Sequence, residues 1–123
     1  MPVPILKQGK LLIATLPAEL ADAELMQFRD DLAERVGKVR ATGVIVDVTA
    51  LDVMDSFSAR TIRGVAHAVR LRGARTVVVG IQPEVAFAMV QLGLSLEGVD
   101  TALDLEEGLE LLGTPAPGKE RRG

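Results

Sequence analysis

Two short runs of β-branched residues constrain the fold of this chain more than any other feature. Residues Gly43 to Val48 read GVIVDV and residues Thr76 to Gly80 read TVVVG, so both runs are almost continuously apolar. A strand with one face in solvent alternates apolar and polar residues, whereas a strand covered on both faces does not. The two runs therefore predict central strands of a mainly parallel sheet with helices over its faces.

Apolar residues recur at helical spacing in two segments. One segment comes after the N-terminal residues, and the other comes after the first of these β-branched runs. Apolar residues recur from Ala21 to Val36, and we expect Gly37 to end this helix. A second helix begins at Asp55 or Ser56, because both side chains have an oxygen that can accept from the free N–H groups of a first turn. The apolar stripe of this second helix is Ile62, Val65, Ala66 and Val69.

The remaining elements complete an alternating pattern. Val3–Lys7 and Lys10–Leu16 flank a Gly-containing turn and predict an N-terminal hairpin. A third helix is expected from Pro83 to Gly93 and, after a short strand near Val99–Thr101, a capping-box pattern from Asp104 predicts a fourth. We therefore expect an α/β fold with a mainly parallel central sheet, an N-terminal hairpin and about four helices.

Length and composition fit one domain with an aliphatic core. The chain has 123 residues, 48% of them hydrophobic, and its aromatic residues are three phenylalanines. A domain of this size buries enough surface to support its own core. We expect a single domain over residues 1–113 and a flexible tail over 114–123, where Pro, Gly and charged residues predominate.

Several classes of protein are disfavoured by what the sequence lacks. There is no cysteine, and the formal net charge is −3, so neither disulfides nor a nucleic-acid-binding basic surface is expected. The N-terminus lacks the pattern of a signal peptide, and no apolar run is long enough to cross a membrane. We expect a cytoplasmic protein without nucleic-acid or membrane partners.

Enzymatic motifs are also missing. The sequence has no Gly-x-Ser-x-Gly elbow and no glycine-rich nucleotide loop. The lone histidine, His67, lies nine residues after Ser58 on the same expected helix, which separates them by roughly 13 Å along its axis. A non-enzymatic protein without a cofactor is therefore expected.

Three aspartates near the end of the first β-branched run allow two other interpretations. Asp47, Asp52 and Asp55 have the oxygen ligands of a cation site, yet strand ends and helix caps account for aspartates without a metal, so no metal site is expected. Asp47 alone fits the phospho-acceptor of a response-regulator receiver. Receivers also have an acidic pair after the first strand and a lysine after a late strand. This chain lacks the acidic pair, and its only late lysine, Lys119, lies in the tail.

The segment VDVTALDVMDSFSARTIR, from Val46 to Arg63, resembles the phosphorylation segment of STAS domains, the family of anti-sigma factor antagonists. The element order fits that family over residues 3–112. Residues 80–93, GIQPEVAFAMVQLG, and residues 101–112, TALDLEEGLELL, are most similar to stressosome proteins, in particular the short RsbS-type antagonist subunit. Sensory paralogues in this family have an additional N-terminal domain, whereas this chain starts directly at the STAS strand.

The resemblance implies a phosphorylated serine at the start of the second helix. The family's acceptor directly follows an aspartate, which maps to Ser56, while the sequence Phe57-Ser58-Ala59 departs from the sporulation-type pattern and leaves Ser58 as a second candidate. The surroundings of this switch are expected to be Asp47, Asp52, Asp55 and Phe57.

By this resemblance, the chain is a non-catalytic stressosome scaffold and antagonist in the general stress response. It would sequester a switch serine/threonine kinase, release it when phosphorylated, and be reset by a phosphatase, in an assembly with a sensory STAS paralogue. The basic residues Arg60, Arg63 and Arg70 are either contacts for a partner or a solvated helix face. Two alternatives are a freestanding antagonist that binds an anti-sigma kinase directly, and a STAS module that binds a nucleotide or another small molecule.

Overall fold

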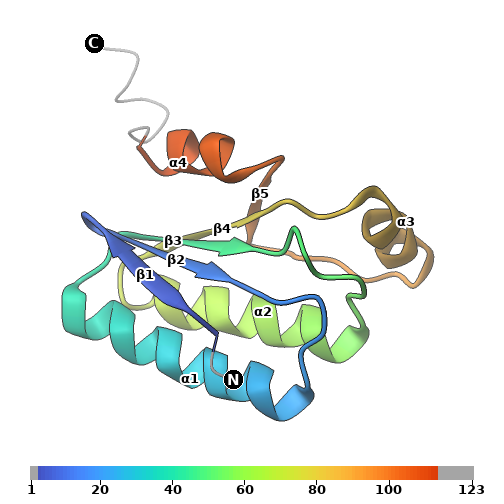
Figure 1. Cartoon of the computed structure of the whole chain (residues 1–123). Helices are drawn as coiled ribbons and strands as arrows, with labels where there is room; N and C mark the ends of the chain where they lie inside the picture. The colour runs from blue at the N-terminus through green and yellow to red at the C-terminus, as the bar shows by residue number, and fades with distance from the viewer. Residues whose placement is uncertain (1–2, 114–123) are drawn as a thin grey trace.

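The two β-branched runs form neighbouring strands in the middle of a five-stranded sheet. The computed structural model describes residues 3–113. The strands are β1 (Ile5–Gln8), β2 (Leu11–Thr15), β3 (Gly43–Asp47), β4 (Arg75–Val79) and β5 (Asp100–Ala102). They lie in the order β1-β2-β3-β4-β5, with β1 antiparallel to β2 and every other pair parallel (Figure 1). The expected mainly parallel sheet with an N-terminal hairpin is confirmed.

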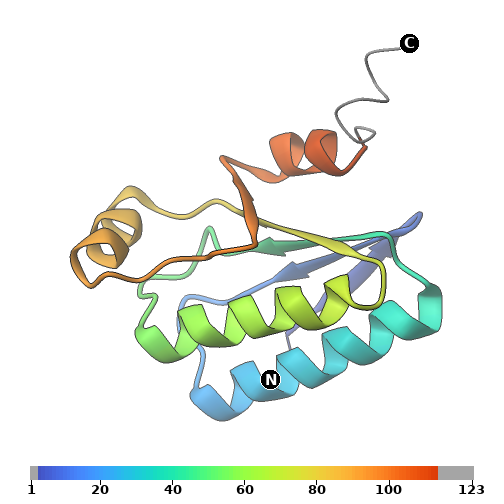
Figure 2. The ribbon, with the colours of Figure 1, turned by 180° about the vertical axis from the view of Figure 1, so that it is seen from behind.

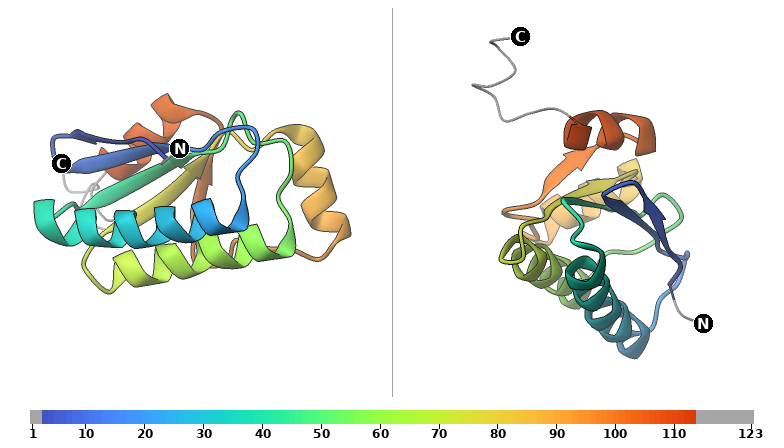
Figure 3. Two further views of the ribbon diagram at one scale, coloured as in Figure 1. Left: turned by 60° about the horizontal axis from the view of Figure 1, so that its bottom comes forward. Right: turned by 90° about the vertical axis from the view of Figure 1, so that its left-hand side faces the viewer.

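Four helices surround this sheet. They are α1 (Asp22–Val39), α2 (Ser56–Arg70), α3 (Pro83–Gln91) and α4 (Leu105–Gly113). Helices α1 and α2 lie side by side on one face, and α4 lies on the other face (Figures 1 and 2). Helix α3 lies beyond the end of the sheet rather than over a face (Figure 3). The element order is the predicted one.

Burial on both faces explains why β3 and β4 are continuously apolar. Val44, Val46 and Val78 belong to the core beneath α1 and α2, which also contains Phe28 and Ile62. The alternate residues Ile45, Val77 and Val79 belong to a smaller core on the opposite face, against Leu109 and Leu112 of α4. The sheet is therefore the middle layer of three, as in Figure 3.

The predicted end of the first helix is wrong. Helix α1 continues through Gly37 to Val39, and the chain leaves it at Arg40, whose φ of 53° is left-handed. A Cβ at Gly37 would lie closest to the guanidinium of Arg72, the end of an exposed and flexible side chain. Gly37 is thus an interior residue of the helix, and the left-handed turn that ends the helix comes three residues later.

Two helical glycines give a matched test of packing against α4. A Cβ at Gly108 would lie 2.7 Å from Cγ1 of Val79 and 3.5 Å from Cδ1 of Ile45, whereas a Cβ at Gly64 meets nothing within 4 Å. We expect Gly64→Ala to raise the free energy of unfolding by about 0.5–1 kcal/mol through helix propensity. Gly108→Ala should lower it by about 1 kcal/mol or more, because overpacking exceeds that gain. Urea denaturation of both variants checks this, and stabilisation by Gly108→Ala would contradict the α4 packing.

Candidate functional site

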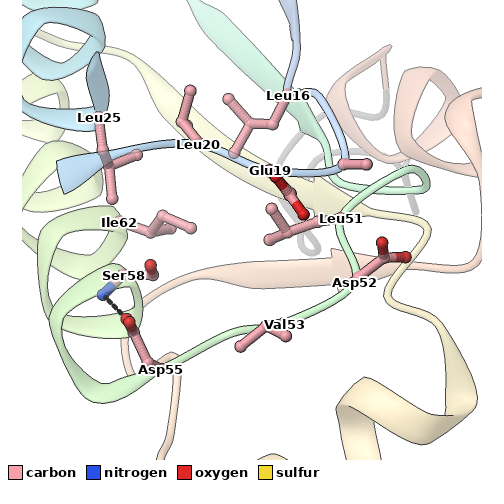
Figure 4. A pocket seen from close by; sticks show the side chains of 11 residues that line it. Leu16, Glu19, Leu20, Leu25, Leu51, Asp52, Val53, Asp55, Ser58 and Ile62 are labelled. Carbon is pink, nitrogen blue, oxygen red and sulfur yellow. Dashed lines mark hydrogen bonds between the residues drawn. The ribbon is translucent and has the colours of Figure 1, made fainter. Parts of the chain in front are cut away.

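The segment that joins β3 to α2 contains the serine-rich stretch singled out by the sequence. Asp55 is the N-cap of α2, with an extended backbone (φ −90°, ψ −179°), and its Oδ1 accepts from the backbone N–H of Ser58 at 2.8 Å (Figure 4). This bond satisfies one of the free donors of the first turn. Of the two residues expected as caps, Asp55 therefore fills the role.

The two candidate serines differ in their surroundings. Ser56 is the first residue of α2 and is exposed. Ser58 is half-buried and lines a pocket together with Asp55. Hydrogen bonds from the Ser58 backbone N–H, and secondarily from its side chain, hold the pKa of Asp55 below its ordinary value of 3.8. Ser58 thus contacts the Asp55 cap, whereas the Ser56 side chain is exposed at the helix start.

Phe57 and Asp47 have structural contacts of their own. The Phe57 ring is half-buried and packs against the core beneath α1 and α2. Asp47, at the end of β3, accepts through Oδ1 from the backbone N–H of Thr49 at 2.9 Å and from its hydroxyl at 2.6 Å. Asp47 therefore shapes the turn after β3 and is not among the residues that line the pocket.

Thr49 also ties this turn to the segment that leads into α3. Its carbonyl oxygen accepts from Nε2 of Gln82 at 2.7 Å. Gly80 lies beside it with a φ of 83°, and a Cβ there would collide with the Thr49 side chain. The loops after β3 and β4 are thereby held together at one end of the sheet.

A pocket of about 220 Å³ opens beside the α2 N-terminus. Its floor is aliphatic, and its residues include Leu16, Leu25, Leu51 and Ile62 (Figure 4). Three carboxylates also line it, from Glu19 in the loop after β2, Asp52 and Asp55. Negative charge around an apolar floor favours the binding of basic or apolar groups and repels anions.

The three arginines of α2 have different environments. Arg60 is exposed, and within residues 3–113 its side chain has no ion pair. The guanidinium of Arg63 donates to the carbonyl oxygen of Ser95 at 2.7 Å and so holds the segment between α3 and β5. Arg70 lines a second cavity at the far end of the helix. The three arginines thus do not form a single basic surface of equally exposed side chains.

The potential metal-ligating side chains are dispersed in the part of the chain that the structure describes. Over residues 3–113, no three His, Asp or Glu side chains gather in a group that could hold a metal ion. Asp47, Asp52 and Asp55 are separated, since Asp52 and Asp55 line the pocket while Asp47 binds Thr49. Nor is any helix of these residues sufficiently long and apolar for a bilayer crossing.

Comparison with known families agrees with this architecture. The STAS domain family matches residues 3–108. The chain belongs to the STAS domain family. Within it, the curated relatives include the RsbT co-antagonist protein RsbRA of Bacillus subtilis, 34% identical over 99 residues, which are 80% of this chain and 35% of RsbRA. RsbRC of the same organism is 33% identical over 70 residues, or 57% of this chain and 25% of that protein. The chain thus spans about a third or less of these relatives.

Solved structures give a fuller match to the STAS domain. A serine-to-glutamate variant of RsbS from Moorella thermoacetica is 34% identical, with a TM-score of 0.77 over 89% of this chain and 93% of that chain. A chain of the stressosome, described as a signal integration and transduction hub, is 35% identical, with a TM-score of 0.75 over 89% of this chain and 95% of that chain. The STAS domain is therefore of the stressosome and anti-sigma factor antagonist type.

Some residues of the site could not be found from the sequence. Glu19 lines the pocket from a loop that is more than thirty residues away from Asp52. The Gln82–Thr49 hydrogen bond likewise joins residues 33 positions apart. Local spacing reveals a cap such as Asp55, but it has no signal for contacts between loops that only the sheet brings together.

The Asp55 cap predicts a pH-dependent contribution to stability. We expect Asp55→Ala to lower the free energy of unfolding at pH 7 by about 1 kcal/mol, and Asp55→Asn, which keeps an acceptor oxygen, to lower it less. Because the folded-state pKa of Asp55 is lowered, the charged cap contributes above the unfolded-state pKa, and this contribution disappears as the pH falls through the folded-state pKa. Denaturation at several pH values should show wild type and Asp55→Asn converging in acid. A gap that persists at about pH 2 contradicts this role.

Proposed function

We propose that this STAS domain sequesters a switch serine/threonine kinase while unmodified and releases it when Ser56 is phosphorylated, as a stressosome scaffold in the general stress response. The observation that supports this most directly is the position of Ser56. It is exposed at the first residue of α2, directly after the Asp55 cap and next to a pocket with an acidic lining. A kinase can reach this hydroxyl without any part of the core opening.

Ser56 suits phosphorylation better than Ser58 does. A phosphate on Ser58 would add charge beside the Asp55 carboxylate that its own backbone N–H contacts, and it would fill part of the pocket. A phosphate on Ser56 lies at the helix N-terminus, where the dipole favours negative charge. Ser56 therefore accepts the modification without loss of the cap, and Ser58 remains the second candidate.

The electrostatic consequence of phosphorylation falls on the partner. Phosphate adds about −1.5 to −2 charges at pH 7. Glu19, Asp52 and Asp55 already make this edge acidic, so the added charge would repel acidic groups of a docked kinase and disfavour apolar groups packed against the pocket. Arg60, exposed on the outer side of α2, is a candidate contact for an acidic group of the same partner.

The remaining parts of the proposal follow from the stressosome relatives. A serine-to-glutamate variant of RsbS and the RsbT co-antagonist RsbRA are both similar to this chain. We infer a non-catalytic, cytoplasmic subunit that assembles with a sensory STAS paralogue and is reset by a phosphatase. A nucleotide-binding role has less support, since the pocket beside α2 has three carboxylates that would repel phosphates.

Phosphosite mapping tests the position of the switch. Wild type, Ser56→Ala and Ser58→Ala are incubated with ATP and a switch serine/threonine kinase from the same organism, and the products are analysed by mass spectrometry. We expect Ser56→Ala alone to abolish modification, because its hydroxyl is the exposed one. Modification that persists in Ser56→Ala and disappears in Ser58→Ala would move the switch to Ser58, and no modification of wild type would overturn the proposal.

Kinase capture tests the electrostatic mechanism with two variants of nearly equal size. Ser56→Asp adds one negative charge at the helix start, whereas Ser56→Asn adds a neutral side chain of the same shape. We expect Ser56→Asp to weaken kinase capture by about tenfold, or about 1.4 kcal/mol, and Ser56→Asn to weaken it much less. Affinity is measured by pull-down and titration calorimetry at low and high salt. Equal losses in both variants would show that shape, rather than charge, controls release.

A further inference from the structure

One buried polar group in the sheet has no partner. Thr76 begins the apolar run of β4, is only 6% exposed, and its hydroxyl oxygen makes no hydrogen bond to any of the described residues. Its side chain lies on the same face of the sheet as Val78, beneath the helices. Buried hydroxyls are nearly always hydrogen-bonded, so an orphan of this kind indicates a missing water, ion or ligand.

Thr76 lines a cavity of about 190 Å³ at the end of α2 opposite to Ser56. This volume is several times the roughly 30 Å³ that one water molecule occupies in the liquid. Arg70 of α2, Arg75 at the start of β4, and Gly98 and Asp100 on the segment entering β5 also line it. Three separate segments of the chain thus meet around one polar space.

The charged groups around the cavity leave a net positive charge. Arg75 is paired with Asp100 through Nη2 at 3.0 Å, so these two charges offset each other. The Arg70 side chain has no ion pair or hydrogen bond within residues 3–113. His67 lies close by, since a Cβ at Gly98 would be 2.9 Å from its Nε2. A guanidinium beside an unpaired hydroxyl is a donor set that matches an oxyanion.

We propose that this cavity binds a small oxyanion, with the Arg70 guanidinium supplying charge and the Thr76 hydroxyl donating a hydrogen bond. Phosphate and carboxylate groups share this chemistry. Bound there, the anion joins the end of α2 to the segment before β5. That segment also includes Ser95, which Arg63 contacts, so the ligand stabilises the packing of α2 against the segment between α3 and β5.

This site is separate from the proposed switch. Ser56 and Arg70 are the first and last residues of α2, which places them about 21 Å apart along the helix axis at 1.5 Å per residue. A ligand at Arg70 therefore does not overlap a kinase docked at Ser56. The two occupants can be present on the same molecule at once.

Thermal unfolding of the full chain tests the site in sodium phosphate, sodium acetate and sodium chloride at equal ionic strength and pH 7. We expect saturating phosphate or acetate to raise the midpoint of wild type by about 5 °C relative to chloride. A rise in only one of the two salts identifies which anion is bound. Arg70→Gln and Thr76→Val should lose most of this rise, while Arg60→Gln, on the same helix outside the cavity, should keep it.

Thr76→Val also distinguishes a ligand site from a structural threonine. In chloride this variant should unfold at a higher temperature than wild type, by on the order of 4 °C, because a methyl group replaces an unpaired buried hydroxyl. A lower midpoint in chloride together with an unchanged rise in both oxyanions would show that the hydroxyl serves the fold rather than a ligand and would overturn the proposal. An equal rise in every variant, which general salt effects produce, or no rise in either oxyanion, would leave only water in the cavity and overturn it too.

Discussion

Burial of β3 and β4 on both faces is the constraint on which the rest of this structure depends. Since helices must cover both sides, each parallel strand is followed by a crossover, and the loops after β2, β3 and β4 all emerge at the same end of the sheet. Glu19, Asp55 and Gln82 belong to these three loops. The parallel sheet thus makes neighbours of the acidic pocket, the Asp55 cap and the hydrogen bond between Gln82 and Thr49.

Separation of the cap from the proposed phosphorylation site makes this end of the molecule suitable for a switch. Asp55, not Ser56, stabilises the first turn of α2. Within residues 3–113 the Ser56 hydroxyl has no hydrogen-bond partner, so the proposed phosphorylation would not require the domain to unfold. The free energy of the added charge would then fall on the contact with a partner rather than on the fold, as the proposed regulation of a docked kinase requires.

The parts of this fold that sequence reasoning predicted are those with a local physical cause. The β-branched runs, the helical periodicity and a cap at Asp55 or Ser56 depend on neighbouring residues, and the structure has all three, with Asp55 as the cap. The expected end of α1 at Gly37 was wrong because a helix tolerates an interior glycine, and the left-handed conformation that ends it is taken by Arg40 instead. The acidic pocket escaped prediction for another reason, since Glu19 reaches it from a distant loop.

Residues that break a local pattern without a local cause point to sites of a different kind. Thr76 stands where the pattern of β4 calls for an apolar side chain, and no neighbour satisfies its hydroxyl. Natural sequences are locally consistent except where function requires otherwise, so this departure is informative in a way that the valines beside it are not. Helix α2 connects this cavity to the proposed phosphorylation site, with Ser56 at its start and Arg70, which lines the cavity with Thr76, at its end. Arg63 joins the same helix to the segment between α3 and β5. A ligand bound in the cavity would therefore also restrain this segment, which directly follows α3. The residue before α3, Gln82, is bonded in turn to Thr49 in the loop that leads to Ser56.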